Sequence, residues 1–221
     1  MRHSDNLLVI APHPDDEILG CGGYVMLARQ AGHRVRVVVL TDGAQGIDGG
    51  VAGVSVREEE SRAGLKILGV EQIDFWRFPD GSIPLSGIII DRLREIMELF
   101  SPSAILLPAP GDTHPDHRRA TRLVLKALTK HWQGRLLFYE IVTPQQPVTR
   151  VVDITPVMDR KLEALHCHVS QTRQYDYEGN CRSLAQLRGI SLGVPWAEAF
   201  LEYQWDGEPE IFFETRPLIS V

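Results

Sequence analysis

The fold is decided by the stretch Ile10-Ala11-Pro12-His13-Pro14-Asp15-Asp16-Glu17. It stands between an apolar run at residues 7–11, which predicts a buried strand, and a helical pattern at residues 18–31. Acidic residues are common in the first turn of a helix, where they interact favourably with its dipole. That preference accounts for one or two carboxylates, but it gives no reason for a histidine held between two prolines. This strand-to-helix turn therefore predicts metal chemistry.

Outward from this turn, short apolar runs alternate with helical patterns along the 221 residues. Predicted strands cover residues 34–40, 73–78, 104–108, 136–142 and 148–154. Predicted helices cover residues 57–68, 88–100, 116–130 and 159–169, whereas residues 171–182 are polar and irregular. The alternation predicts a single α/β domain over residues 1–221, Rossmann-like, with a mostly parallel sheet and helices on both faces. In such a sheet the active site lies at the C-terminal ends of the strands.

Composition excludes several classes of protein. The formal net charge of −6 gives no basic surface for nucleic acid or for an anionic membrane. No apolar stretch reaches 18 residues, and the first apolar run is too short for a signal peptide. We therefore expect no transmembrane segment and a protein that is cytoplasmic, or recruited to a membrane surface without spanning it. Cys21, Cys167 and Cys181 are too far apart to predict a disulfide framework or a thiolate zinc site. The oligomeric state stays open, a homo-oligomer included.

A second reactive stretch, residues 112–117, follows the predicted strand at residues 104–108. His13 and Asp16 are three residues apart, as are His114 and His117, so each pair can converge on one point in a turn. Two such loops at adjacent strand ends would surround a single ion. Two imidazoles and one carboxylate form a common catalytic zinc site, and the same donors suit a non-haem Fe(II) site, so ligand type does not fix the metal.

Other candidates have two interpretations each. Arg57 follows a glycine-rich loop at residues 43–55 and opens a helix, so it could bind sugar hydroxyls or phosphate, or pair with Glu60. The loop is a candidate lid or a flexible surface loop. His166 and His168 receive no ligand role. Four residues could line a specificity pocket or could simply pack: Arg173, Tyr175, Tyr177 and Trp196.

Two motifs carry a resemblance to a known family. His13-Pro14-Asp15-Asp16-Glu17 with His114-Pro115-Asp116-His117 resembles the PIG-L/LmbE-like family of zinc-dependent N-acetylglucosaminyl deacetylases. Further segments similar to family motifs are Arg57-x-x-Glu60-x-x-x-Ala63, Pro79-Asp80-Gly81, residues 161–171 and Glu198-Ala199-Phe200. Pro12 stands where some members carry alanine.

The resemblance implies His13, Asp16 and His117 as ligands of one Zn²⁺ per chain. It also implies Asp15 as the general base that takes a proton from the attacking water.

Three further roles follow from the resemblance. His114, in its protonated form, would stabilise the oxyanion, Asp116 would orient it, and Arg57 would bind substrate. Proton delivery to the leaving amine could come from Asp15 or His114.

The implied reaction removes the acetyl group from a small N-acetylated amino sugar conjugate. Two alternatives remain: an Fe(II) enzyme that uses the same site, and a deacylase or amidase acting on a non-sugar N-acyl substrate. A dinucleotide-binding oxidoreductase is disfavoured, because the first strand-to-helix turn lacks Gly-x-Gly-x-x-Gly and carries acids that would repel a pyrophosphate. The group linked to the sugar is not predicted by any motif.

Overall fold

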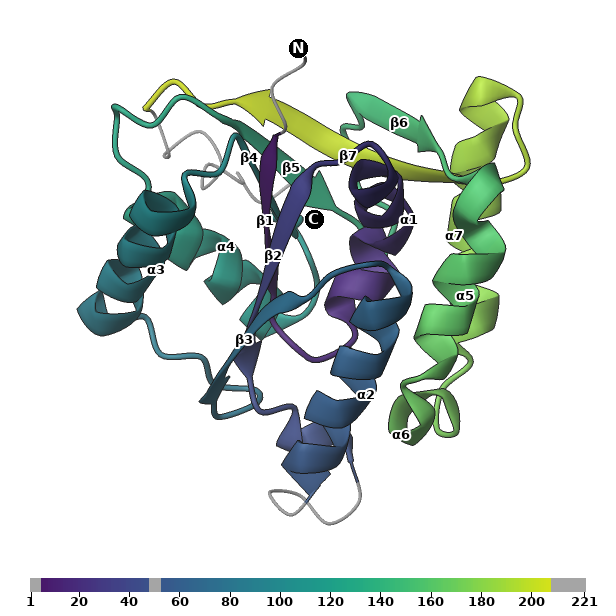
Figure 1. Cartoon of the computed structure of the whole chain (residues 1–221), viewed down its shortest axis with the longest axis horizontal. Coiled ribbons are helices and arrows are strands. Elements are labelled where there is room, and N and C mark those ends of the chain that lie inside the picture. Colours follow the sequence, from purple (N-terminus) through teal and green to yellow (C-terminus); the bar gives the residue numbers. More distant parts are fainter. Residues whose placement is uncertain (1–4, 48–52, 208–221) are drawn as a thin grey trace, which may run out of the picture.

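The computed structural model describes residues 5–47 and 53–207, and within them seven strands form one sheet in the order β3-β2-β1-β4-β5-β7-β6 (Figure 1). The strands are β1 Asn6–Ala11, β2 Arg34–Thr41, β3 Gln72–Phe78, β4 Ala104–Pro108, β5 Arg135–Tyr139, β6 Arg150–Asp153 and β7 Ala197–Gln204. Strands β1 to β5 pair in parallel, and β7 runs antiparallel to both β5 and β6. The predicted mostly parallel sheet is confirmed.

Helices cover both faces of the sheet, as predicted. They are α1 Asp16–Gln30, α2 Val54–Ile67, α3 Gly87–Phe100, α4 Pro115–Ala127, α5 Met158–His166, α6 Val169–Thr172 and α7 Tyr177–Gly189. Helices α3 and α4 cover one face, and α1, α2, α5 and α7 lie on the other (Figure 1). Side chains of a strand alternate between faces, so Leu7 and Val9 enter one hydrophobic cluster while Leu8 and Ile10 enter the other.

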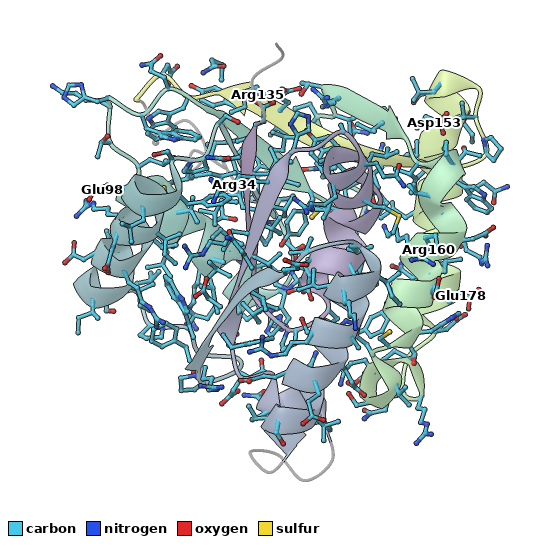
Figure 2. The ribbon with its side chains drawn as sticks, viewed as in Figure 1. Arg34, Glu98, Arg135, Asp153, Arg160 and Glu178 are labelled. Atoms are coloured by element: carbon cyan, nitrogen blue, oxygen red, sulfur yellow. The ribbon has the colours of Figure 1, made fainter. Side chains whose placement is uncertain are left out.

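Side chains fill the space between helices and sheet, while Glu98 and Arg160 lie on outer, exposed helix surfaces (Figure 2). Among the described residues, no helix has the length and apolar character needed to cross a bilayer.

Two elements differ from the sequence prediction. Helix α7 covers much of the stretch read as irregular, and the helix predicted at residues 159–169 is divided into α5 and the short α6. Strand β7 falls where no strand was predicted and separates β5 from β6. Part of the predicted loop at residues 43–55, namely residues 48–52, lies outside the described residues. The rest of that loop contains a short 3₁₀ turn at Ala44–Gly46 and the start of α2.

A buried ion pair holds the first turns of α1 in place. The helix is interrupted at Cys21, whose φ of −147° and ψ of 17° are not helical. The Glu198 carboxylate accepts hydrogen bonds from the backbone N–H groups of Gly23 (2.8 Å) and Tyr24 (2.7 Å), and Lys161 Nζ donates to the Leu19 carbonyl (2.9 Å) and to Glu198 (2.7 Å). The pair thus satisfies backbone groups on either side of the interruption.

The strand order reverses between β1 and β4. β1 pairs with β2 on one side and with β4 on the other, so the loops that follow β1 and β4 leave the sheet side by side. Such a switch point is where open α/β sheets bind ligands. Both histidine motifs follow these two strands.

Candidate active site

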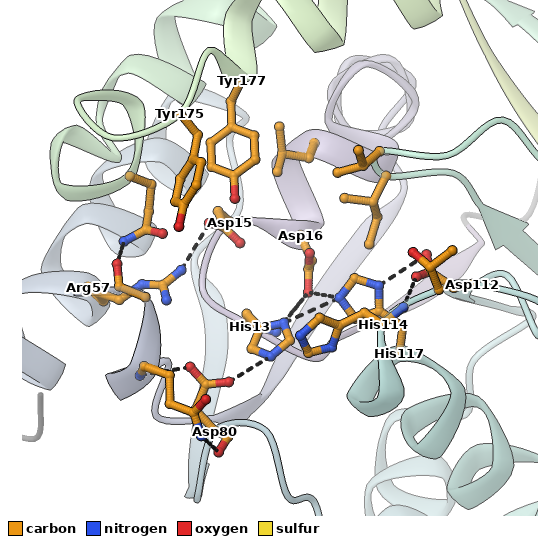
Figure 3. Close-up of a pocket in the computed structure, with 17 residues that line it drawn as sticks. His13, Asp15, Asp16, Arg57, Asp80, Asp112, His114, His117, Tyr175 and Tyr177 are labelled. Atoms are coloured by element: carbon orange, nitrogen blue, oxygen red, sulfur yellow. Dashed lines mark hydrogen bonds and ion pairs between the residues drawn. The ribbon is translucent and has the colours of Figure 1, made fainter.

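A cavity of about 380 Å³ opens at the carboxyl ends of β1 and β4 (Figure 3). Six of the predicted site residues line it: His13, Asp15, Asp16, Arg57, His114 and His117. Asp116 is fully buried and does not line it. The other lining residues include Asp80, Asp112, Tyr175 and Tyr177. The fold therefore brings together residues separated by more than a hundred positions.

Three donor atoms converge at the base of the cavity, which we call the floor: His13, Asp16 and His117. Asp16 Oδ2 lies 3.1 Å from His13 Nδ1 and 3.3 Å from His117 Nε2, and the two nitrogens are 3.3 Å apart. Ligands at 2.0–2.2 Å around a tetrahedral zinc ion are separated by about 3.4 Å. The donor set and its spacing therefore fit a zinc ion.

Two wider groups also bring donor atoms within 4.8 Å of one another: His13 with His114 and His117, and His13 with Asp80 and Asp116. The floor is the tighter grouping, because Asp16 approaches both imidazoles within 3.3 Å. We therefore regard Asp80 and Asp116 as partners of His13 rather than as the ligands themselves.

The second nitrogen of each floor histidine faces a carboxylate. His13 Nε2 lies 3.1 Å from Asp80 Oδ1, and His117 Nδ1 lies 3.1 Å from Asp112 Oδ2, although neither contact has full hydrogen-bond geometry. Histidines that bind metals are commonly oriented in this way by an outer carboxylate. Sequence reasoning missed both acids as partners. Asp112 opens the second motif and Asp80 lies in the Pro-Asp-Gly turn, but neither position reveals its histidine.

This packing shifts the pKa values of the floor residues. Burial alone would lower the pKa of His117, but Asp16 and Asp112 outweigh it and raise the pKa to about 9. Burial would raise the pKa of Asp16, and the His117 and His13 imidazoles instead lower it well below its usual range. Asp16 is therefore ionised and ready to bind a cation.

Asp15 occupies a strained position beside the floor. Its φ of 144° is uncommon for a residue with a side chain. Arg57 donates from Nη2 to Asp15 Oδ2 (2.9 Å) and to the Pro14 carbonyl, and from Nη1 to the Gly43 carbonyl. Burial raises the pKa of Asp15 to about 7, even though Arg57 acts to lower it. A carboxylate with this pKa can exchange a proton near neutral pH.

The pairing of Arg57 with Glu60, one of the two sequence interpretations, does not form. The Glu60 carboxylate accepts hydrogen bonds from the backbone N–H (2.8 Å) and hydroxyl (2.6 Å) of Ser170. Arg57 is buried and turned towards Asp15, because α2 begins next to the β1 loop.

Glu17 supports the strained backbone of Asp15. Its Oε2 accepts the Asp15 backbone N–H (3.0 Å), and its Oε1 accepts the Ser61 hydroxyl (2.6 Å). Glu17 is 1% exposed, and this burial raises its pKa to about 7. The sequence marks Glu17 only as a third acid in the motif, and nothing in it marks Ser61.

His114 caps α4. Its Nδ1 accepts the Asp116 backbone N–H (3.2 Å), which places the proton of the neutral ring on Nε2. The Asp116 carboxylate accepts instead from the backbone N–H groups of Gly81 (2.7 Å) and Ile83 (3.1 Å). The predicted orientation of His114 by the Asp116 side chain is thus replaced by a backbone contact. Burial, with the nearby His13 and His117, lowers the pKa of His114, which disfavours the predicted protonated form.

Of the four residues considered for specificity, Tyr175 and Tyr177 line the cavity. Trp196 packs against the hydrophobic core instead, and Arg173 is exposed and does not line the cavity. His168, which received no ligand role, is fully buried at the start of α6, and burial lowers its pKa to about 3.

Comparison with known proteins identifies the family of this chain. The family model described as PIG-L, GlcNAc-PI de-N-acetylase, matches residues 8–128. The diacetylchitobiose deacetylase of Thermococcus kodakarensis is 32% identical over 87% of this chain and 80% of its own length. A probable N-acetyl-alpha-D-glucosaminyl L-malate deacetylase 2 of Bacillus cereus is 26% identical over 91% of this chain and 99% of its own. The structure of N,N'-diacetylchitobiose deacetylase from Pyrococcus horikoshii superposes with a TM-score of 0.83, at 26% identity, covering 98% of this chain and 88% of that one. The chain belongs to the PIG-L family of deacetylases.

Proposed function

We propose that this protein is a zinc-dependent hydrolase that removes the acetyl group from an N-acetylated amino sugar conjugate. The observation that carries the proposal is the convergence of His13 Nδ1, Asp16 Oδ2 and His117 Nε2 within 3.3 Å of one another, next to the buried carboxylate of Asp15. The names of the relatives support an N-acetylated sugar as the substrate. A cytoplasmic location remains an expectation from the sequence.

His13, Asp16 and His117 would hold the zinc ion. When bound, zinc lowers the pKa of water towards about 7 and polarises a carbonyl group. Asp15 acts as the general base and takes a proton from the water that attacks the acetamide carbon. Asp15 Oδ2 already accepts a hydrogen bond from Arg57, so Oδ1 is the oxygen that takes this proton.

This arrangement assigns Arg57 mainly to holding Asp15. Both of its Nη atoms donate to protein acceptors, although the side chain still lines the cavity and can touch a bound sugar.

His114 faces the developing negative charge. Its Nε2–H, in the tautomer fixed by the Asp116 backbone, can donate to the oxygen of the tetrahedral intermediate. As the C–N bond breaks, the leaving amine needs one proton. The proton held by Asp15 supplies it, and His114 is the alternative donor. The products are acetate and the free amino sugar.

The direct test measures acetate release by zinc-loaded protein from N-acetylglucosamine and N,N'-diacetylchitobiose, with wild type and Asp15→Asn. We expect the variant to keep its zinc and to lose roughly 10²–10⁴-fold in rate, the usual contribution of a general base. Acetate release by Asp15→Asn at the wild-type rate would remove Asp15 from the mechanism.

Two comparisons address the alternatives. Metal analysis after anaerobic purification separates a zinc from an iron enzyme: iron in stoichiometric amount, with activity that zinc does not restore, would favour the iron enzyme. N-acetylated amino acids serve as the non-sugar substrates, and faster acetate release from them would favour an amidase of different specificity.

A further inference from the structure

One side of the cavity differs from its charged floor. We call it the aromatic wall: Tyr175 just before α7 and Tyr177 at its first residue, with Ile141 and Val142 after β5. The two tyrosine ring centroids are 5.5 Å apart, and Tyr175 and Val142 are 54% and 55% exposed. Figure 3 shows both tyrosine hydroxyls directed towards Asp15 and the interior of the cavity.

The tyrosine hydroxyls are available to a ligand. Neither hydroxyl has a hydrogen-bond partner among the residues that the structure describes. This contrasts with the carboxylate of Glu17 and the two Nη atoms of Arg57, all of which contact protein groups. The aromatic wall therefore offers apolar ring surface and two free hydroxyl groups.

The charges that line the cavity are mostly negative. Four carboxylates line it: Asp15, Asp16, Asp80 and Asp112. Among the described lining residues, Arg57 is the one permanently charged cation, and its Nη atoms are bound to Asp15 and to two backbone carbonyls. Even with Asp15 protonated, the other three carboxylates would balance the positive charges of a zinc ion and of Arg57. An anionic group on the substrate would therefore find no unpaired cation in the lining.

We propose that the group attached to the acetylated sugar is a neutral second pyranose ring, bound against the aromatic wall. This inference rests on the proposed deacetylase function and specifies its substrate class. A pyranose presents C–H faces that pack on aromatic rings and hydroxyls that bond to tyrosine O–H groups. A cavity of about 380 Å³ is at the small end of ligand sites, which span about 300–1,000 Å³. Tyr175 and Tyr177 are thus the specificity residues of this site.

The experiment compares acetate release from N-acetylglucosamine, N,N'-diacetylchitobiose and N-acetylglucosaminyl malate. We expect the disaccharide to have the highest kcat/KM and the malate conjugate the lowest. Tyr175→Ala should lower kcat/KM for the disaccharide about tenfold, mainly through KM, and so reduce its advantage over the monosaccharide. Tyr175→Phe, which keeps the ring, should lose less. Ile190→Ala is the control, because Ile190 is 75% exposed and does not line the cavity.

Two outcomes would overturn the inference: faster turnover of the malate conjugate than of the disaccharide, or equal losses on monosaccharide and disaccharide in Tyr175→Ala. Calorimetric binding to zinc-loaded Asp15→Asn separates this result from the catalytic proposal. Disaccharide binding that Tyr175→Ala weakens in this background supports the aromatic wall even if no substrate releases acetate. Equal disaccharide affinity with and without Tyr175→Ala in this background contradicts it.

Discussion

The floor and the aromatic wall of the cavity are built in opposite ways. The floor residues lie in the loop after β1 and in the first turns of α1 and α4, are at most 9% exposed, and lie within 3.3 Å of neighbouring carboxylates or imidazoles. The wall comes from later segments, and Tyr175 and Val142 are more than half exposed. Catalytic groups must be positioned before substrate arrives, whereas a surface that selects substrates must keep its polar groups free. Variants of the floor should therefore affect every substrate, and variants of the wall should affect the choice among substrates.

The largest effect should come from removing a floor ligand. In His117→Ala we expect loss of bound zinc and a fall in acetate release of at least about a thousandfold on all substrates, because zinc supplies several kcal/mol of stabilisation to the transition state. Metal analysis after dialysis, together with acetate assays, measures both. Stoichiometric zinc in the dialysed variant would show that His117 is not a ligand.

The next effect concerns the support of Asp15. Glu17→Ala leaves the buried N–H of Asp15 without its acceptor, and we expect kcat to fall about a hundredfold with zinc content unchanged. Glu17→Gln should recover most of the rate, because its amide oxygen can accept from Asp15 and its amide N–H can donate to the Ser61 hydroxyl. Equal losses in the two variants would mean that Glu17 acts through its charge and not through this contact.

Part of the cavity was predictable from the sequence, and the parts that were not predictable have physical reasons. The meeting of the two histidine motifs could be predicted, because apolar runs locate β1 and β4 and because His13 and Asp16 are three residues apart in one turn. The choice of His13, Asp16 and His117 among the donors came from the family resemblance and not from spacing. The contact between His13 and Asp80 could not be predicted, since it depends on how the chain after β3 folds back over β1. Linear spacing carries no record of such a path.

The elements near the wall were missed for a different reason. The buried residues of α7 are Cys181, Ala185 and Gly189, and such small side chains form no clear hydrophobic stripe. β7 places the charged Glu198 inward, where it pairs with Lys161, so its pattern does not resemble that of a buried strand.

A smaller effect is expected from the partner of a floor histidine. Asp112→Asn should weaken zinc binding about 10–100-fold, the usual effect of altering a carboxylate that orients a metal-bound histidine. Competition with a chelator measures the affinity. Asp74→Asn is the control, because Asp74 pairs with Arg36 on the sheet and does not line the cavity. A zinc affinity within twofold of wild type would show that Asp112 does not orient His117.

The smallest expected effect is on the pH dependence of the free energy of unfolding, through His168 in the segment that leads to the aromatic wall. His168 precedes α6, and its carbonyl accepts the backbone N–H groups of Gln171 and Thr172. Burial lowers its pKa to about 3 in the folded protein, whereas the unfolded chain has a pKa of about 6.5. Below pH 6.5 the unfolded chain therefore binds a proton that the folded protein does not, and stability falls as the pH falls from 6.5 towards 3. At pH 5.5 the loss is about 1.4 kcal/mol.

Urea unfolding of wild type and His168→Leu at pH 7.0 and 5.5, with EDTA present, measures this loss. We expect the stability of wild type relative to the variant to decrease by about 1.3 kcal/mol between the two pH values. The raised pKa values of Asp15 and Glu17 act in the opposite direction, since they favour the folded state as the pH falls, but they are common to both proteins and cancel in the difference. A difference that does not change with pH would mean that His168 takes up a proton while folded, so that the segment leading to the aromatic wall would be open to water, unlike the floor.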